Sequence, residues 1–539
     1  LQSYQVPLTD DETNERIEFE ADGETLRVCD AVESEELLLR ADREFDPRPA
    51  LTDLFPFPVD RAISFETGSL SIPAYSAVTV RDEHGEFIAQ LDESMELRRG
   101  SYCFDITGVT KALVRVEGVE VDATGMKGDG PVELIFDRPR TVTVGARSLH
   151  TRPEATITVP DDPAALAEAV SVLGSSIKEF TPERSWPTLR GYPPRIERGD
   201  ELDIPSPLVA PDTGVEVVVR PTYDDVYRLS TLAYYLGARM VVGDAPAIRL
   251  DTGYVERLPT DGAALEERAE ELLRTWFFLD TLARTEGYVP SDRYEYDQVG
   301  GKLPFYPPNL ADLSMSERLM EYLEVDPETV APYTPDWPTE AVLRPNADAM
   351  TLLPHLAHVL APVRVRGAAE PPRPDAPNAL ATSPWLAPEG GVPDPDVDPL
   401  PAGASVLTPA TYENRLRRTR TARGDARVVV MVDSAERAAA IRSALSEPAV
   451  PEGIESWAVI DRPDRETVAD ALGDGDIDVA YCGLPIEGDR VVACDGTVAL
   501  DDLDGAPAVT IFEGTRRWSL GAQSVSHGGL LGVLFESAI

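Results

Sequence analysis

The sequence contains almost no lysine. Of its 49 basic residues only four are lysines, whereas 95 residues are acidic, which leaves a formal net charge of −46. Such a charge pushes a compact chain apart at low salt, and concentrated salt screens it. Because 42% of the residues are hydrophobic, the composition is that of a globular protein and not of a disordered one. This combination is typical of halophiles that accumulate salt, such as haloarchaea, and it argues against nonspecific nucleic-acid binding through the bulk surface.

Cysteines and long apolar runs are also scarce. The chain has four cysteines, Cys29, Cys103, Cys482 and Cys494, and no Cys-x-x-Cys pair. Scattered thiols in a large chain are typical of a reducing compartment, so we expect a cytoplasmic protein with free cysteines. No stretch reaches the ~18 apolar residues that a membrane span requires, and no signal peptide is recognisable. Since the first residue is not methionine, we expect the sequence to be a fragment of a longer product.

Common signature motifs are absent as well. The sequence has no G-x-x-x-x-G-K-[ST], H-E-x-x-H or G-x-S-x-G motif, which excludes the usual phosphate-binding loop, zinc peptidase and serine hydrolase. His355 and His358, at i and i+3, could share a metal ion, but no third ligand stands near them, so a structural role is the preferred interpretation. We therefore expect no cofactor and no metal.

At 539 residues the chain exceeds the roughly 250–300 residues of one hydrophobic core, which predicts a multidomain protein. Residues 1–160 show short alternating runs separated by turn signals such as Asp22-Gly23, and we expect an antiparallel β sandwich or barrel there. The expected strands are 17–20, 26–29, 63–66, 77–80, 87–91, 95–98, 101–105, 113–119, 132–136 and 141–144.

Residues 161–366 show helical periodicity and one apolar strand, Val215 to Val219, which predicts an α/β or α+β domain. Gly237 and Gly287 stand where C-terminal caps of two helices belong. The expected helices are 163–173, 223–236, 264–286, 313–323 and 347–360.

Two aromatic clusters lie on these helices. Tyr223, Tyr227, Tyr234 and Tyr235 could line a pocket, and residues 276–278 (Trp-Phe-Phe) follow on the longest helix. Aromatic stripes at helical spacing are more often part of a core, which is the interpretation preferred here.

Residues 367–404 are rich in proline, and we expect a stiff, extended linker that forms no helix and no ladder. A basic segment follows, from Arg415 through Arg417, Arg418 and Arg420 to Arg427. It could bind an acidic partner or nucleic acid. The preferred alternative is that it neutralises acidic surface within the same chain.

In residues 405–539, short β-branched runs alternate with helices. This pattern predicts βαβ units and a parallel sheet covered on both faces. Reactive groups in such sheets lie beyond the carboxyl ends of the strands, so the residues after Tyr481 and Phe512 matter most. The expected strands are 426–432, 454–460, 477–481, 508–512 and 530–535, and the expected helices are 435–445, 465–472 and 517–526.

One pattern extends over residues 478–484 (Asp-Val-Ala-Tyr-Cys-Gly-Leu), 492–496, 500–503 and 511–521, and it continues through 528–533. This pattern resembles the CHAT family of caspase-like cysteine peptidase domains. In that family one strand ends in a Gly-His pair, and the next strand ends at the catalytic cysteine before a small helix. Trp518, Gly521 and Gly528 agree with the family pattern.

The two catalytic positions of the family do not agree. Leu484 stands in place of the histidine and Thr515 in place of the cysteine. A cysteine peptidase needs a thiolate and a group that takes or holds the thiol proton, and neither residue supplies one. A displaced pair of Cys482, or Cys494, with His527 is the alternative. The preferred interpretation is that Cys482 is a buried apolar residue and His527 a surface or cap residue.

The resemblance thus implies a caspase-like domain without its catalytic pair. We expect a cytoplasmic, regulatory or protein-binding pseudopeptidase with a protein partner, in a halophilic archaeon. The first alternative is an active cysteine peptidase with a rearranged site. The second is nucleic-acid binding through the arginine segment.

Overall fold

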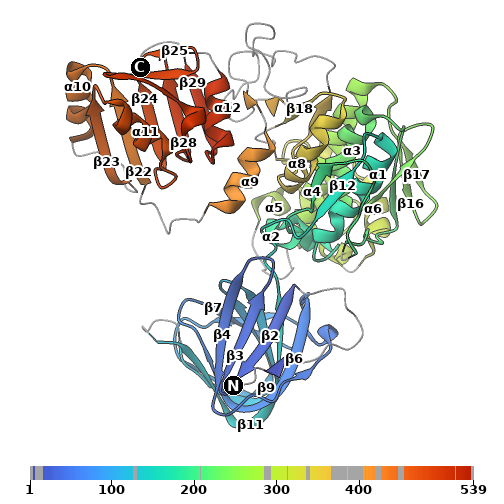
Figure 1. Cartoon of the computed structure of the whole chain (residues 1–539). Coiled ribbons are helices and arrows are strands. Elements are labelled where there is room, and N and C mark those ends of the chain that lie inside the picture. Colours follow the sequence, from blue (N-terminus) through green and yellow to red (C-terminus); the bar gives the residue numbers. More distant parts are fainter. Residues whose placement is uncertain are drawn as a thin grey trace. The chain divides into compact units, whose positions relative to one another are not determined.

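The computed structural model describes most of the chain, with elements labelled as in Figure 1. The described residues are 4–5, 16–125, 130–206, 208–284, 293–311, 313–335, 340–365, 385–386, 405–406, 408–418, 426–446, 454–515 and 518–535. The chain divides into two compact units, Leu1–Trp337 with Leu356–Pro362, and Pro338–His355 with Val363–Ile539. The first unit contains both the strands of the predicted β domain and most elements of the predicted α/β domain. The boundaries of the three proposed domains stay a prediction.

The first part of the chain forms one large antiparallel sheet, which confirms the predicted antiparallel β region. Its strand order is β1-β2-β3-β4-β6-β11-β10-β9-β7-β8, with β5 paired to β6. The elements are β1 (Tyr4–Gln5), β2 (Ile17–Asp22), β3 (Thr25–Asp30), β4 (Glu35–Ala41), β5 (Arg48–Pro49), η1 (Thr52–Leu54), β6 (Arg61–Ile72), β7 (Ala77–Asp82), β8 (Phe87–Gln90), β9 (Met95–Thr107), β10 (Lys111–Ala123) and β11 (Val132–Arg147).

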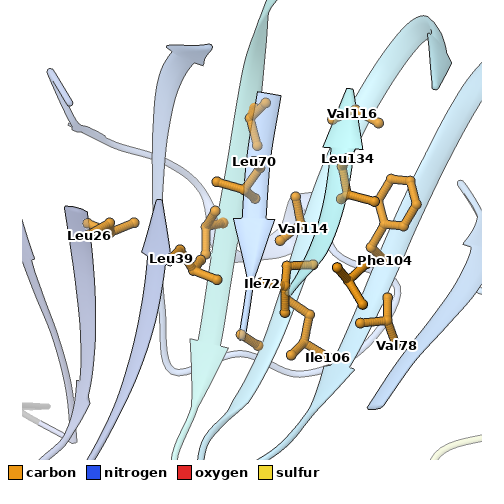
Figure 2. Close-up of a cluster of buried hydrophobic side chains, with 14 of the residues drawn as sticks. Leu26, Leu39, Leu70, Ile72, Val78, Phe104, Ile106, Val114, Val116 and Leu134 are labelled. Carbon is orange, nitrogen blue, oxygen red and sulfur yellow. The ribbon is translucent and has the colours of Figure 1, made fainter. Parts of the chain in front are cut away.

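Alternate residues of these strands bury their side chains in one hydrophobic core, shown in Figure 2. Successive residues of a strand point to opposite faces, so every second residue shares a face. Phe104 and Ile106 of β9 therefore lie together in this core, beside Val114 and Val116 of β10. Two pairs of predicted short strands are each one long strand, β9 and β11. Register shifts in β10 after Val116 bend the ladder without ending it.

The next part of the chain combines helices with two small sheets. Strands β12 and β13 are parallel, and the mixed sheet has the order β15-β14-β16-β17. Thr222 caps α3 by accepting a hydrogen bond from the N–H of Asp225, and Gly237, at a φ of 55°, ends it as predicted. The other predicted cap, Gly287, lies outside the described residues. The elements are β12 (Thr156–Val159), α1 (Pro163–Leu173), η2 (Gly174–Ser176), η3 (Pro182–Ser185), α2 (Pro187–Arg190), β13 (Arg195–Arg198), β14 (Val215–Val219), α3 (Tyr223–Leu236), β15 (Arg239–Val242), β16 (Ala247–Leu250), β17 (Val255–Arg257), α4 (Gly262–Ala283), α5 (Tyr294–Val299), η5 (Gly300–Lys302), η6 (Pro307–Leu310), α6 (Met315–Leu323) and α7 (Pro327–Val330).

Four short parallel strands follow, in the order β19-β18-β20-β21. One of them, β20, corrects the expectation that the proline-rich segment forms no ladder, since Trp385 pairs with both Ala341 and Ser405. Trp385 and Leu386 lie between prolines but keep their own N–H groups, so a two-residue ladder is open to them. The rest of residues 367–404 lies outside the described residues. The elements are β18 (Ala341–Leu343), η7 (Ala347–Leu352), α8 (Leu353–His358), β19 (Val363–Val365), β20 (Trp385–Leu386) and β21 (Ser405–Val406).

The predicted helix over residues 347–360 is a 3₁₀ helix followed by a short α-helix. Pro354 stands at the second position of α8. It can occupy the first turn of a helix but not its interior, so the two segments remain separate helices.

The C-terminal elements form a five-stranded parallel sheet, which confirms the predicted parallel sheet. Its order, β23-β22-β24-β28-β29, is the doubly wound order in which the first strand lies between the second and third. A small antiparallel sheet, β25-β26-β27, lies between β24 and β28 in the chain. The elements are α9 (Pro409–Arg417), β22 (Ala426–Val432), α10 (Ala435–Ser446), β23 (Ile454–Asp461), α11 (Arg465–Gly473), β24 (Val479–Gly483), β25 (Ile486–Glu487), β26 (Arg490–Ala493), β27 (Gly496–Ala499), η8 (Leu500–Asp502), β28 (Val509–Glu513), α12 (Trp518–Ser526) and β29 (Leu531–Phe535).

Each face of this sheet has its own apolar cluster. Val430 and Val432 of β22 pack with Ala438 of α10 in one cluster. Met431, which points to the other face, packs with α11 and with strands β26 and β27 in the second. The sheet is therefore buried on both sides, as a parallel sheet requires. No helix among the described residues is long and apolar enough to cross a membrane.

Candidate functional site

The candidate site lies at the carboxyl ends of β24 and β28. These strands are parallel neighbours, and the last paired residues of their ladder are Cys482 and Phe512. Leu484 and Thr515 follow two and three residues later on strands about 4.8 Å apart. The fold therefore carries both residues to the same edge of the sheet. Leu484 is 3% exposed and belongs to the apolar cluster, and Thr515 is buried too.

Cys482 lies inside the apolar cluster that contains Leu484, on one face of the sheet, as the alternation of β24 indicates. The thiol is fully buried, and this burial raises the pKa of Cys482 to about 12. Below that pH the residue stays a neutral thiol, which is neither a nucleophile nor a metal ligand.

His527 lies at the end of α12, where its ring engages its own helix. Nδ1 is 2.8 Å from the carbonyl oxygen of Gln523 and 3.2 Å from the hydroxyl of Ser526. Cys494 is exposed in the turn between β26 and β27, and its backbone N–H donates to the carbonyl of Pro463. The contacts described for Cys482, Cys494 and His527 are thus made with other neighbours and not with one another.

Three polar side chains that the sequence did not single out meet at this same edge. Arg437 of α10 donates hydrogen bonds to Glu513 Oε2 (2.5 Å) and to the Tyr481 hydroxyl (2.8 Å). The Tyr481 hydroxyl donates to the same carboxylate oxygen at 2.5 Å. The guanidinium also lies 5.8 Å from the centre of the Tyr481 ring. We call Arg437, Tyr481 and Glu513 the edge triad.

Gly483 allows the edge triad to close. A Cβ at this position would lie 3.0 Å from Glu513 Oε2, 3.0 Å from the Tyr481 ring and 3.2 Å from Arg437 Nη1. Such distances are shorter than ordinary van der Waals contacts, so a larger side chain would displace at least one of the three. A Cβ here would therefore force one of these side-chain ends to move by a few tenths of an ångström.

The electrostatics of the triad favour a charged Arg437 and a neutral Tyr481. The hydrogen bond with Glu513 raises the pKa of Arg437 above its ordinary value. Burial, followed by the hydrogen bond to Glu513, raises the pKa of Tyr481 to about 12. The side chain of Glu513 is 7% exposed and that of Arg437 26% exposed. Arg437 and Glu513 thus form an ion pair. The Tyr481 phenol stays neutral at neutral pH, so it is not an anionic nucleophile.

The sequence carried a weak signal for the triad. Tyr481 and Glu513 stand at the ends of predicted strands, where reactive groups of parallel sheets belong. Arg437, however, is one of 45 arginines, and only the packing of α10 on the sheet brings it to Glu513. Because the three residues come from segments that are far apart in sequence, spacing alone could not associate them.

Two arginines of the basic segment contact groups of the C-terminal elements. Arg418 donates to the carbonyls of Gly528 and Ala506, and Arg427 lies 3.8 Å from Asp474 and 4.0 Å from Asp476. Arg415 and Arg417 are exposed on α9, and Arg420 lies outside the described residues.

Asn414, which also lies on α9, is buried. It donates to the carbonyls of Val525 (2.6 Å) and Gly529 (2.8 Å), so α9 is fixed to the end of α12. These contacts favour the interpretation in which the segment serves its own chain.

The other sequence candidates are engaged in packing. His355 stacks on Tyr412 with ring centres 4.5 Å apart, and His358 stacks on Tyr192 at 4.1 Å. In the part of the chain that the structure describes, no group of three or more His, Cys, Asp or Glu side chains is arranged to hold a metal ion. The aromatic clusters of α3 and α4 supply buried core residues, namely Tyr227, Tyr234, Tyr235, Trp276 and Phe278.

Comparisons with protein-family models, with curated proteins and with solved structures give no significant match. The resemblance to CHAT domains therefore depends on the residues and on the topology of this chain alone.

Proposed function

We propose that residues 405–539 form a caspase-like domain of the CHAT type that has lost peptidase activity and serves as a protein-binding, regulatory module. The observation that carries this proposal is the position of Leu484 and Thr515 at the carboxyl ends of adjacent parallel strands. In the family these two ends hold the histidine and the cysteine. An aliphatic side chain and an unactivated hydroxyl in their place can neither take up a proton nor act as a thiolate.

The alternative of a rearranged peptidase receives no support from the geometry. Cys482 is a buried thiol whose pKa of about 12 keeps it protonated, and His527 is hydrogen bonded within its own helix. An activated cysteine needs the opposite environment, with partial exposure and a nearby positive charge that lowers the thiol pKa.

A binding role is compatible with the edge triad at the carboxyl ends of β24 and β28. Crevices outside the carboxyl ends of parallel strands, at the point where the strand order reverses, are the usual ligand sites of such sheets. Here the order reverses between β22 and β24, and Arg437 follows β22 on α10. Its guanidinium is partly exposed beside Tyr481, and these groups suit recognition of an acidic or carboxylate-bearing partner.

A thiol-directed peptidyl probe, applied to the protein in molar KCl, tests the loss of activity. We expect no labelling beyond slow modification of exposed Cys494. Labelling that Cys482→Ala abolishes would establish the rearranged peptidase instead.

The binding role has a test of its own. A protein captured from the source lysate by the wild-type chain should be lost with Arg437→Met, which removes the guanidinium from the edge. It should be retained by Arg490→Gln, which changes an exposed arginine of β26 elsewhere on the same domain. Equal capture by both variants would place the partner away from this edge.

A further inference from the structure

Five arginines gather in the first unit, in the elements around the end of α4. Arg184 of η3 and Arg318 of α6 are 0% exposed, and Arg190 of α2 and Arg284, which follows α4, are buried as well. Arg293, just before α5, is half-buried. Buried arginines are rare unless they are paired. Four of them in one region, with a fifth half-buried, therefore require an explanation.

One carboxylate, that of Asp280, is shared among several of these groups. It lies 2.8 Å from Arg184 Nη2 and 3.7 Å from Arg318 Nε. It also accepts hydrogen bonds from the hydroxyls of Tyr235 (2.5 Å) and Tyr322 (2.9 Å). Its oxygens are therefore saturated, and Asp280 has little capacity left to compensate the remaining arginines.

The cluster has a surplus of positive charge. Besides Asp280, the buried carboxylate that acts on these groups is Glu183, which lies near Arg284 and Arg293. Among the described residues, these two buried carboxylates and the exposed carboxylate of Glu295, which acts on Arg293, thus face five guanidinium groups. Burial lowers the pKa of Arg284 to about 10, still well above neutral pH, and lowers the pKa of Arg190 as well. Guanidinium groups keep their charge in proteins.

Several buried N–H donors of the cluster have no hydrogen-bond acceptor among the described residues. They are Nε of Arg184, Arg190, Arg284 and Arg293, and both Nε and Nη1 of Arg318. A buried donor without an acceptor costs about 1–3 kcal/mol, and more when it is charged. Such a concentration of unsatisfied donors requires an explanation, and a bound anion is one that would supply acceptors to several of them at once.

We propose that this arginine cluster binds a multiply charged oxyanion, the phosphate group of a small molecule. Planar guanidinium groups match the oxygens of phosphate in paired hydrogen bonds, and several converging arginines suit a dianion better than a single charge. The buried hydroxyl of Ser185, which also lacks a partner among the described residues, adds a further donor. Arg284 stacks on the partly exposed ring of Trp186 at 4.1 Å, which places this guanidinium at the outer side of the cluster.

Calorimetric titration of the full chain in molar KCl tests this site, with inorganic phosphate, pyrophosphate and citrate as three separate probes. We expect saturable binding of pyrophosphate or phosphate, together with a rise in the unfolding temperature. Binding should be at least about tenfold weaker in Arg284→Gln/Arg293→Gln, because each lost charged hydrogen bond is worth a factor of that order. This variant leaves the contacts of Asp280 in place.

The matched control is Arg268→Gln, which changes an arginine of the same helix α4 that pairs with Glu256 and Glu271. Its affinity should equal that of the wild type. If the double variant does not fold, the half-buried Arg293→Gln alone repeats the comparison. Absence of saturable binding of both phosphate compounds to the wild type, saturation by citrate alone, or unchanged affinity in the folded variants would overturn the proposal.

Discussion

Arg437 on α10 donates a 2.5 Å hydrogen bond to Glu513 at the carboxyl end of β28. The bond joins the helix that follows the first strand of the C-terminal sheet to the fourth strand, across the strand between them. It holds an ion pair at the edge of the sheet that also carries Leu484 and Thr515, the positions of the catalytic pair in the proposed family. The predictions below concern this edge and the elements fixed to it.

Replacement of Gly483 by alanine should destabilise the C-terminal domain. The added Cβ would meet Glu513 and Tyr481 at 3.0 Å, and relief of these contacts requires at least one side chain of the edge triad to shift. We expect a loss of about 1–3 kcal/mol, as for overpacked cores, measured by urea unfolding in molar KCl.

Gly475→Ala is the matched control, since a Cβ there meets nothing within 4 Å. Its effect should stay within about 0.5 kcal/mol. An equal effect of the two substitutions would show that Gly483 is not required for close packing.

The ion pair itself should contribute measurable coupling. Arg437→Met leaves the buried carboxylate of Glu513 with the Tyr481 hydroxyl as its remaining partner within the triad. We expect a loss of about 1–3 kcal/mol, near the lower end because Arg437 is partly exposed. A double-mutant cycle with Glu513→Gln should give a coupling of about 0.5–3 kcal/mol. Additive losses would mean that the two side chains act independently. Arg490→Gln, on the exposed side of β26, serves as the control and should be neutral.

The cysteines should differ sharply in reactivity. At about pH 8 iodoacetamide should modify exposed Cys494 and leave Cys482 intact, because burial raises the pKa of Cys482 to about 12. Between the ordinary pKa of 9.0 and about 12, the unfolded chain releases this proton and the folded chain keeps it. The contribution of Cys482 to stability is therefore complete below pH 9 and is lost as the pH rises through that window.

Mass spectrometry of the alkylated native protein measures these rates, with Cys494→Ala as the control that should abolish rapid modification. Rapid modification of Cys482 in the folded wild type would contradict its assignment as a buried neutral thiol.

The attachment of α9 depends on one side chain. Asn414→Ala removes two hydrogen bonds to buried carbonyls of the α12 end, and we expect a cost of about 1–3 kcal/mol and faster proteolysis within residues 409–418. Arg415→Ala, a change of an exposed residue on the same helix, should leave the cleavage rate unchanged. If the two variants are cut at equal rates, the contacts of Asn414 do not hold this helix in place.

The elements of the C-terminal sheet were predictable because their apolar runs and caps are local. Val428 to Val432 form a strand, and residues 435–445 a helix, as their patterns indicate. The positions of Leu484 and Thr515 at strand ends follow from the same patterns. The edge triad does not, since Arg437 reaches Glu513 only through the packing of α10 on the sheet.

Elsewhere, long-range packing overrode local signals. Strand β4 was missed because its three consecutive leucines, Leu37 to Leu39, break the alternation of a half-buried strand. Trp385 and Leu386 pair with β18 despite the prolines around them, because a partner strand outweighs the local composition. The arginine cluster around Asp280 gave no sequence signal at all, since arginines spread over more than a hundred residues converge only in the folded chain.

The central claim is that Leu484 and Thr515 occupy the places of a catalytic pair. The most direct measurement compares Thr515→Cys with Leu484→His/Thr515→Cys in a Cys494→Ala background and follows the pH dependence of iodoacetamide alkylation. The account predicts that the imidazole lowers the pKa of the introduced thiol and makes it react faster near neutral pH. An identical alkylation profile with and without Leu484→His, in folded protein, would contradict it.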